Sequence, residues 1–128
     1  MLRFNYRGTV RSTKKNKKNQ NMETLTVNKI LAKVKTFLQK TYQDKLDQVI
    51  LFGSRARGDH HAGSDVDILI VLKEPFNYSQ EVEKTSVFIS ELSLECDLVI
   101  SRVFAETKDL NSKNTPFFMN IRKEGVIL

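Results

Sequence analysis

The chain of 128 residues is poor in cysteine, proline and tryptophan, with one, two and none of them respectively. A disulfide needs two thiols, so the single Cys96 excludes an internal disulfide and a cysteine-based zinc site. No apolar run approaches the roughly 20 residues of a membrane span, and the N-terminus lacks the apolar stretch of a secretory signal. These absences predict a cytoplasmic protein that works away from membranes and without redox chemistry.

Acidic residues are absent from the first 21 positions, which hold seven of the 21 basic residues and leave 14 basic and 15 acidic residues in the rest of the chain. The net charge of +6 therefore belongs to an Asn/Lys-rich leader that lacks apolar residues to pack. We predict a disordered leader over residues 1–21 and one near-neutral folded domain over 22–128.

Three explanations compete for the leader: a basic arm that contacts nucleic acid, an Arg-rich targeting peptide, or sequence upstream of a start at Met22. Met22 directly precedes the first amphipathic segment, so a chain that began there would keep the whole core. Composition favours the third explanation.

Apolar periodicity predicts alternating helices and strands. Apolar residues recur at the spacing of a one-sided helix over 25–42 and again over 79–92. Short apolar runs predict strands at 49–52 and 66–72, and an alternating pattern predicts a third strand at 93–101. The fold class is therefore α/β, with a small sheet covered by helices.

The C-terminal region predicts one more helix. Thr115 and Pro116 are typical of a helix N-cap and first turn, and Gly125 is expected to end the helix as a left-handed cap. Of the neighbouring Phe117 and Phe118, one is expected in the core, and the other is left open as core or partner contact.

The most informative segment joins the two central strands. Ten residues separate the pair Gly53-Ser54 from Asp65, and Asp67 follows Asp65 by two positions. Residues two apart on a strand point to one face, about 7 Å apart along it. Unpaired carboxylates beside a buried strand would cost several kcal/mol each, a cost that a bound cation largely removes. One or two divalent metal ions are therefore expected at Asp65 and Asp67.

The glycine-serine pair predicts a phosphate site. Glycine lets the backbone approach a phosphate closely, and a turn that begins at Ser54 would direct N–H groups and a hydroxyl toward it. Arg55 and Arg57 would add positive charge. Asp97, placed in the predicted third strand, is a candidate third metal ligand or the acceptor of a proton from an attacking hydroxyl.

These residues resemble the DNA polymerase β nucleotidyltransferase superfamily, whose pattern is Gly-Ser, a spacer, Asp-x-Asp and a third Asp on a later strand. The resemblance over residues 25–128 is closer to the minimal nucleotidyltransferases, the MNT antitoxins of toxin–antitoxin systems with HEPN toxins. The matching segments are Gly53–Gly58, Ser64–Ile68, Cys96–Val99 and Glu124–Leu128.

The resemblance implies a polymerase β-like fold with a small mixed sheet, and an enzyme that transfers AMP from ATP, with Mg²⁺, to a tyrosine of a cognate HEPN ribonuclease. Gly53 and Ser54 would hold the triphosphate, with Arg55 and Arg57 beside them. Asp65, Asp67 and Asp97 would hold the metals. A hetero-oligomer with the toxin is expected, and nucleic acid is not required.

Two other functions stay open. The protein could neutralise a toxin by binding alone, with vestigial catalytic residues, or it could be a nucleotidyltransferase that acts on a small molecule or on RNA. The adjacent His60 and His61 lie in a glycine-flanked loop and are expected to be exposed rather than to bind one metal together.

Overall fold

The computed structural model describes the backbone of residues 14–128 and the side chains of residues 22–128. Its helices and strands follow one another in the order α1 (Lys14–Tyr42), a short 3-10 helix (Gln43–Lys45), β1 (Leu46–Phe52), α2 (Ser54–Arg57), β2 (Val66–Leu72), α3 (Tyr78–Cys96), β3 (Ile100–Glu106), α4 (Thr107–Ser112), α5 (Pro116–Glu124) and β4 (Val126–Ile127).

The strands form one mixed sheet in the order β3-β2-β1-β4. β1 pairs antiparallel with both β2 and β4, and β2 pairs parallel with β3. Because β2 and β3 run in the same direction, α3 connects them as a crossover helix. The predicted α/β class and the small mixed sheet are confirmed.

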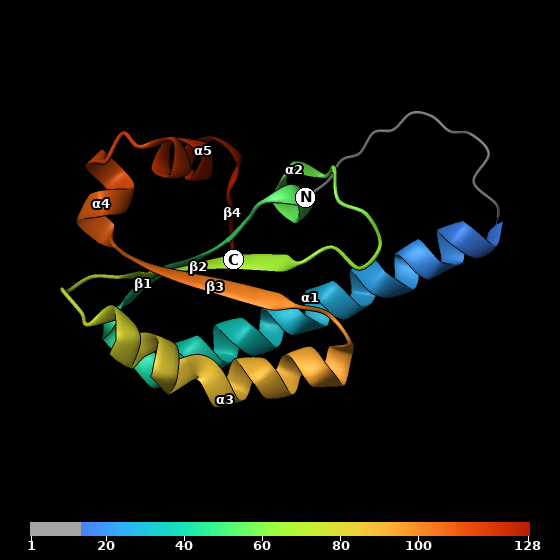
Figure 1. Cartoon of the computed structure of the whole chain (residues 1–128), viewed down its shortest axis with the longest axis horizontal. Helices are drawn as coiled ribbons and strands as arrows, with labels where there is room; N and C mark the ends of the chain where they lie inside the picture. Colours follow the sequence, from blue (N-terminus) through green and yellow to red (C-terminus); the bar gives the residue numbers. More distant parts are fainter. Residues whose placement is uncertain (1–13) are drawn as a thin grey trace.

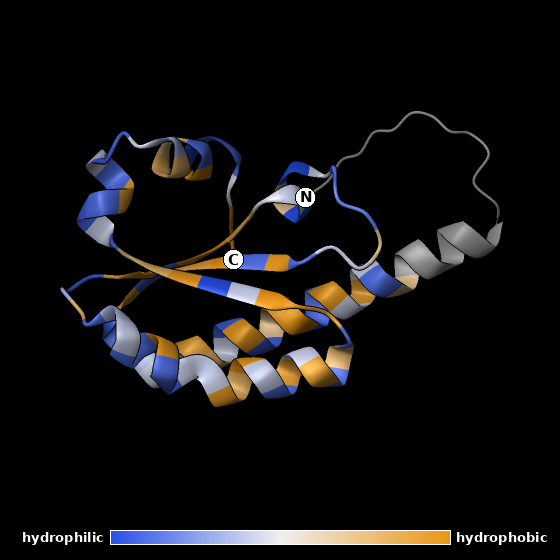
Figure 2. Cartoon of the chain, viewed as in Figure 1, coloured by the Kyte–Doolittle hydropathy of each residue, from blue (hydrophilic) through white to orange (hydrophobic). Residues whose placement is uncertain are grey.

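Helices cover both faces of the sheet, with α1 and α3 on one side and α4 and α5 on the other (Figure 1). Val66, Ile68 and Ile70 of β2 pack in the larger core cluster, which contains residues of α1 and α3. Leu69 and Val71 pack in the smaller cluster with Leu110 and Ile121, which come from α4 and α5. Both faces of β2 are therefore buried, and Figure 2 shows hydrophobic residues concentrated in the strands and in stripes along α1 and α3.

Two predicted elements match closely, and the first helix extends further than expected. The strand predicted at 66–72 has those bounds, and the last helix has Thr115 as its N-cap and Pro116 in its first turn. The helix predicted from residue 25 begins at Lys14, so residues 14–21 of the expected disordered leader are helical. Once a helix is nucleated, each further residue adds a backbone hydrogen bond, and Lys and Gln are good helix formers. Residues 1–13 of the predicted leader lie outside the described residues.

The strand predicted at 93–101 is wrong for most of its length. Helix α3 continues to Cys96, and β3 begins only at Ile100. Ile89, Leu92 and Cys96 continue the helical spacing into the core cluster, whereas Leu94, which an inward-facing strand would bury, is 82% exposed. Apolar residues in this segment fit both periods, and the packing of α3 decides between them.

Gly125 ends α5 in a different way from the predicted left-handed cap. Its φ is −65°, a value that any residue adopts, and its N–H donates to Ile121 O at 2.8 Å. A Cβ at this position would lie 2.7 Å from both Ile121 O and Ile50 Cγ2. Glycine is therefore required here by close packing and not by its backbone angle.

No described helix has the length and the apolar character that crossing a membrane requires.

The close packing at Gly125 predicts the effect of a substitution. Gly125→Ala forces the new methyl group against the Ile121 carbonyl and the Ile50 side chain, and we expect it to lower the free energy of unfolding by about 1–3 kcal/mol. Urea denaturation followed by circular dichroism measures this value. Asn120→Ala, an exposed change in the same helix, serves as the control and is expected to stay within about 0.5 kcal/mol of wild type. Equal stability of both variants would contradict the packing argument.

Candidate active site

The turn after β1 brings the backbone against a carboxylate. Gly53 adopts φ 76° and ψ −157°, outside the regions open to other residues, and precedes the short helix α2. A Cβ at this position would collide with Oδ2 of Asp67. The N–H groups of Ala56 and Arg57 both donate to Gly53 O at 3.1 Å. The N–H groups of Ser54 and Arg55 precede these bonds, at the start of the helix, where backbone N–H groups have no partner within the helix. The predicted phosphate turn and the predicted metal ligand Asp67 are therefore adjacent.

Asp67 lies in β2, between two neighbouring strands. Asp67 pairs in register with Phe52 on β1 and with Ser101 on β3. Its side chain is half-buried, and burial raises the pKa of the carboxyl above its usual value, with a further rise from the nearby Asp65 carboxylate. Arg57 acts in the opposite direction and lowers this pKa. The site thus concentrates negative charge where water only partly solvates it, which favours a bound cation.

Asp65 comes just before β2 and is exposed. The next residue, Val66, is fully buried and donates its N–H to Val99 O at 2.9 Å. Asp65 is close enough to Asp67 for its carboxylate to raise the pKa of the Asp67 carboxyl. Paired carboxylate oxygens are the ligands that Mg²⁺ and Mn²⁺ prefer, so these two residues could hold a divalent ion.

The two predicted arginines have different surroundings. Arg55 is 4% exposed, and its guanidinium donates from Nε to Ser64 O at 3.0 Å and from an Nη atom to Glu23 at 2.7 Å. Arg57 is half-exposed, pairs with Asp59 at 3.2 Å and acts electrostatically on Asp67. The charge of Arg57 therefore reaches Asp67, whereas Arg55 is engaged with α1 and with the loop before β2.

Asp97 lies at the end of α3 and not within a strand. It is the C-cap of that helix, with φ 53° and ψ 41°, and its side chain is exposed. Because β3 starts at Ile100, the residue beside Asp67 on the next strand is Ser101. Within residues 22–128, no three side chains of His, Cys, Asp and Glu group closely enough to hold a metal ion. The structure therefore brings Asp65 and Asp67 together but does not add Asp97 to them.

His60 and His61 are exposed in the loop, as expected. Partial desolvation and the positive charge of Arg55 lower the pKa of His60. The backbone N–H of His61 donates to Ser64 Oγ at 2.8 Å, and Ser64 N–H donates back to His61 O at 3.0 Å. These two bonds close a turn immediately before Asp65.

Sequence reasoning missed two features beside the site. Glu23 of α1 accepts hydrogen bonds from Arg55 and from the Gly63 N–H, 40 residues away, a separation that no local pattern reveals. Three aromatic rings also lie in contact beside the site. Phe52 is the partner of Asp67 on β1, and its ring centre is 5.6 Å from that of Phe117. The ring centres of Phe117 and Phe118 are 5.2 Å apart. Phe118 packs against the core and Phe117 is 37% exposed, so one of the two phenylalanines is a core residue, as predicted.

Comparisons with known proteins identify the family and the fold of the chain. The model of the family "Nucleotidyltransferase domain" matches residues 31–127. The chain is 40% identical over 97 residues to "Putative protein adenylyltransferase MJ0141" of Methanocaldococcus jannaschii, an alignment that covers 76% of this chain and 93% of that protein.

Two solved structures are similar in fold. A "putative nucleotidyltransferase" of Sulfolobus solfataricus gives a TM-score of 0.56 at 23% identity and covers 93% of this chain and 90% of its own. A chain of a mutant form of the toxin–antitoxin complex MntA-HpeT gives a TM-score of 0.51 at 25% identity and covers 79% of this chain and 69% of its own. The matched family spans Gly53, Ser54, Asp65, Asp67 and Asp97. The resemblance inferred from the motifs is confirmed, and the chain belongs to the nucleotidyltransferase domain family.

Proposed function

We propose that this protein is an antitoxin that transfers AMP from ATP, with Mg²⁺, to a tyrosine hydroxyl of a HEPN-family toxin and so inactivates it. The observation that carries the proposal is the close approach of the Asp67 carboxylate to Gly53, where a Cβ would collide with Oδ2, because the turn proposed for the phosphates then lies beside the pair proposed for the metal. The adenylyltransferase name of the 40% identical relative supports the AMP group, and the toxin–antitoxin complex among the similar structures supports a toxin as the partner.

Each site residue has a role in this reaction. Asp65 and Asp67 would hold the divalent ion, which would offset the charge of the triphosphate and polarise its phosphoryl oxygens. Gly53 and Ser54 would bind phosphate oxygens through the backbone and the hydroxyl, and Arg57 would add positive charge. Arg55 is engaged with Glu23 and Ser64, so we assign it to positioning the loop and not to the phosphates.

The chemistry is an in-line displacement at the α-phosphorus. The tyrosine oxygen forms a bond to that phosphorus, the bond to the bridging oxygen of the β-phosphate breaks, and pyrophosphate leaves. The hydroxyl proton passes to a carboxylate, for which we propose Asp97. The parallel register of β2 and β3 puts Asp97 at the end of the sheet where Asp65 lies, and its exposed side chain is accessible to an acceptor from another protein.

The first test is the intact mass of a HEPN partner encoded beside the gene, after incubation with this protein, ATP and Mg²⁺. We expect the partner to gain mass in units of one AMP with wild type and not with the double variant Asp65→Ala/Asp67→Ala, because the ligands of the ion are then gone. Lys33→Gln is the matched control. It breaks an exposed ion pair between Lys33 of α1 and Glu95 of α3, and it should transfer AMP as wild type does.

Other results of this experiment would select another function. A stable complex without any mass gain would favour neutralisation by binding alone. Incorporation of AMP into RNA or a small molecule in the absence of a partner would favour the corresponding transferase. Transfer by the double variant at the wild-type rate would contradict the metal assignment.

The role of Asp97 has its own test. If Asp97 accepts the proton, Asp97→Asn should slow AMP transfer about 10²–10⁴-fold and leave Mn²⁺ affinity unchanged. Single-turnover rates and Mn²⁺ titration by electron paramagnetic resonance measure the two quantities separately. A loss of Mn²⁺ affinity would instead make Asp97 a metal ligand, and wild-type behaviour in both would remove it from the site.

The raised pKa of Asp67 predicts how stability depends on pH and metal. Because the folded state raises this pKa above its usual 3.8, the protonated carboxyl stabilises the fold below that pH, and this contribution is lost as the pH rises through the raised value. Without metal at pH 7, Asp67→Asn should therefore melt at the same temperature as wild type or higher, and this advantage should shrink toward pH 4.

Divalent metal should reverse that order. At pH 7, Mn²⁺ at 100 times its dissociation constant should stabilise wild type by about 2.7 kcal/mol, because a ligand that binds only the folded state shifts the equilibrium by mass action. Asp67→Asn should gain far less. Melting curves followed by circular dichroism measure both effects, and equal stabilisation of the two proteins by Mn²⁺ would contradict a metal site at Asp67.

A further inference from the structure

The residue that most needs positioning at the site is Asp65. Asp67 is held by the ladders of β2, but Asp65 precedes the strand and is exposed. On its C-terminal side, the Val66 N–H bonds to Val99 O at 2.9 Å. On its N-terminal side, the backbone depends on the loop that ends at Ser64, so whatever fixes Ser64 restricts where the Asp65 backbone, and with it the carboxylate, can lie.

Arg55 holds Ser64 from inside the protein. Its Nε donates to Ser64 O at 3.0 Å, in addition to the two bonds that close the His61–Ser64 turn. Arg55 is 4% exposed, and its backbone lies in α2, directly after Gly53. It therefore connects the phosphate turn to the backbone next to Asp65.

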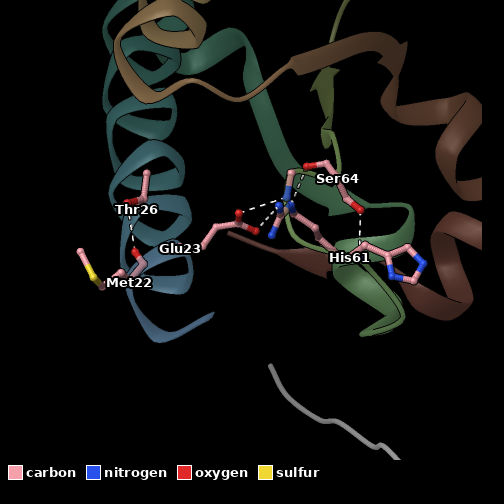
Figure 3. Close-up of polar contacts among 7 residues, drawn as sticks. Met22, Glu23, Thr26, His61 and Ser64 are labelled. Carbon is pink, nitrogen blue, oxygen red and sulfur yellow. Dashed lines mark hydrogen bonds and ion pairs between the residues drawn. The ribbon is translucent and has the colours of Figure 1, made fainter. Parts of the chain in front are cut away.

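Glu23 completes this connection from α1. One carboxylate oxygen accepts from Arg55 at 2.7 Å, and the other accepts from the Gly63 N–H at 3.1 Å. Figure 3 shows the Glu23 side chain extending from the helix toward the loop that carries His61 and Ser64. A single carboxylate thus bonds both to the arginine that holds Ser64 and directly to the loop.

Glu23 lies within α1 and not at its end. The helix begins nine residues earlier, at Lys14, so Glu23 does not lie in a terminal turn, where helices fray. Three residues further on, Thr26 Oγ1 bonds to Met22 O at 3.0 Å, and Val27 is in the core. The bond to Arg55 therefore fixes the loop to an element that the core holds in place.

We infer that Glu23 is a positioning residue, which acts through Arg55 and Gly63 to hold Asp65 where it can bind the divalent ion. The inference rests on the proposed function for the role of the ion, but it concerns the affinity for that ion and not the identity of the acceptor. Partners outside the ligand set of a metal site typically change metal affinity or activity about 10–100-fold when they are removed.

The test compares Mn²⁺ binding by wild type, Glu23→Gln and Arg55→Lys, measured by electron paramagnetic resonance on folded protein. Glu23→Gln keeps the size of the side chain but removes the charge that pairs with Arg55. Arg55→Lys keeps the charge but has a single nitrogen, which cannot contact Ser64 O and Glu23 as the guanidinium does. We expect each variant, and the double variant, to lose Mn²⁺ affinity by the same factor of about 10–100.

Two controls separate positioning from a general loss of stability. Lys33→Gln removes an exposed ion pair, 3.1 Å long, that joins Lys33 of α1 to Glu95 of α3, and it should leave Mn²⁺ affinity unchanged. Asp65→Ala gives the affinity that remains without the ligand. Lower melting temperatures with unchanged Mn²⁺ affinity would overturn the inference and make the pair purely structural. If Glu23→Gln does not fold because its buried arginine is unpaired, Arg55→Lys, in which the charges stay balanced, decides the same question.

Transfer activity distinguishes failure of this inference from failure of the proposed function. Wild type that binds Mn²⁺ but does not modify a HEPN partner would contradict the proposed acceptor and leave the affinity comparison valid. Wild type that transfers AMP while Glu23→Gln binds Mn²⁺ and transfers equally well would overturn the positioning role alone. Where both hold, the kcat of Glu23→Gln should fall at Mn²⁺ concentrations that saturate wild type and recover as Mn²⁺ is raised.

Discussion

The close approach of the Gly53 backbone to the Asp67 carboxylate is the constraint on which the site depends. Antiparallel pairing of β1 and β2 puts Phe52 opposite Asp67, so the chain leaves β1 directly beside that carboxylate. A side chain at position 53 would occupy the space of Asp67 Oδ2, and the φ of 76° independently favours glycine. Two requirements, one steric and one conformational, thus select glycine at this position. With glycine there, the turn proposed to bind phosphates can lie against the carboxylate pair proposed to bind metal.

Packing of the core raises the electrostatic cost of an ionised carboxylate at Asp67. β2, which carries Asp67, lies between β3 and β1 in the sheet. Its residues after Asp67 are buried on both faces. The same burial that stabilises the fold leaves Asp67 half-desolvated beside Asp65 and raises its pKa. A strand end is where such a pair can exist, because one step further into the strand an ionised carboxylate would be fully desolvated. A cation that binds there relieves a cost that the fold itself imposes.

Local patterns in the sequence predicted what depends on local structure. The bounds of β2 follow from a continuous apolar run, and the start of α5 follows from Thr115 and Pro116. The segment before β3 was assigned wrongly because its apolar residues fit both periods, and only the packing of Leu92 and Cys96 against the core decides for helix. Glu23 could not be found from the sequence, since its bond to Arg55 spans 32 residues and depends on how α1 lies against the loop. The roles of Asp65, Asp67 and Asp97 stay predictions, although the first two are now adjacent in space.

The two arginines of the motif show why identical residues two positions apart have different roles. On a helical turn, residues i and i+2 do not face each other, so Arg55 and Arg57 of α2 cannot both point to the same ligand. Glu23 fixes which of them turns inward, because its charge pairs with the buried Arg55 at 2.7 Å. Arg57 is left on the outer side, where its charge acts on Asp67 and lowers the pKa of that carboxyl. Glu23 of the first helix therefore engages one arginine of the motif and also contacts the loop before Asp65, and the phosphate role that we propose falls to the other arginine, Arg57.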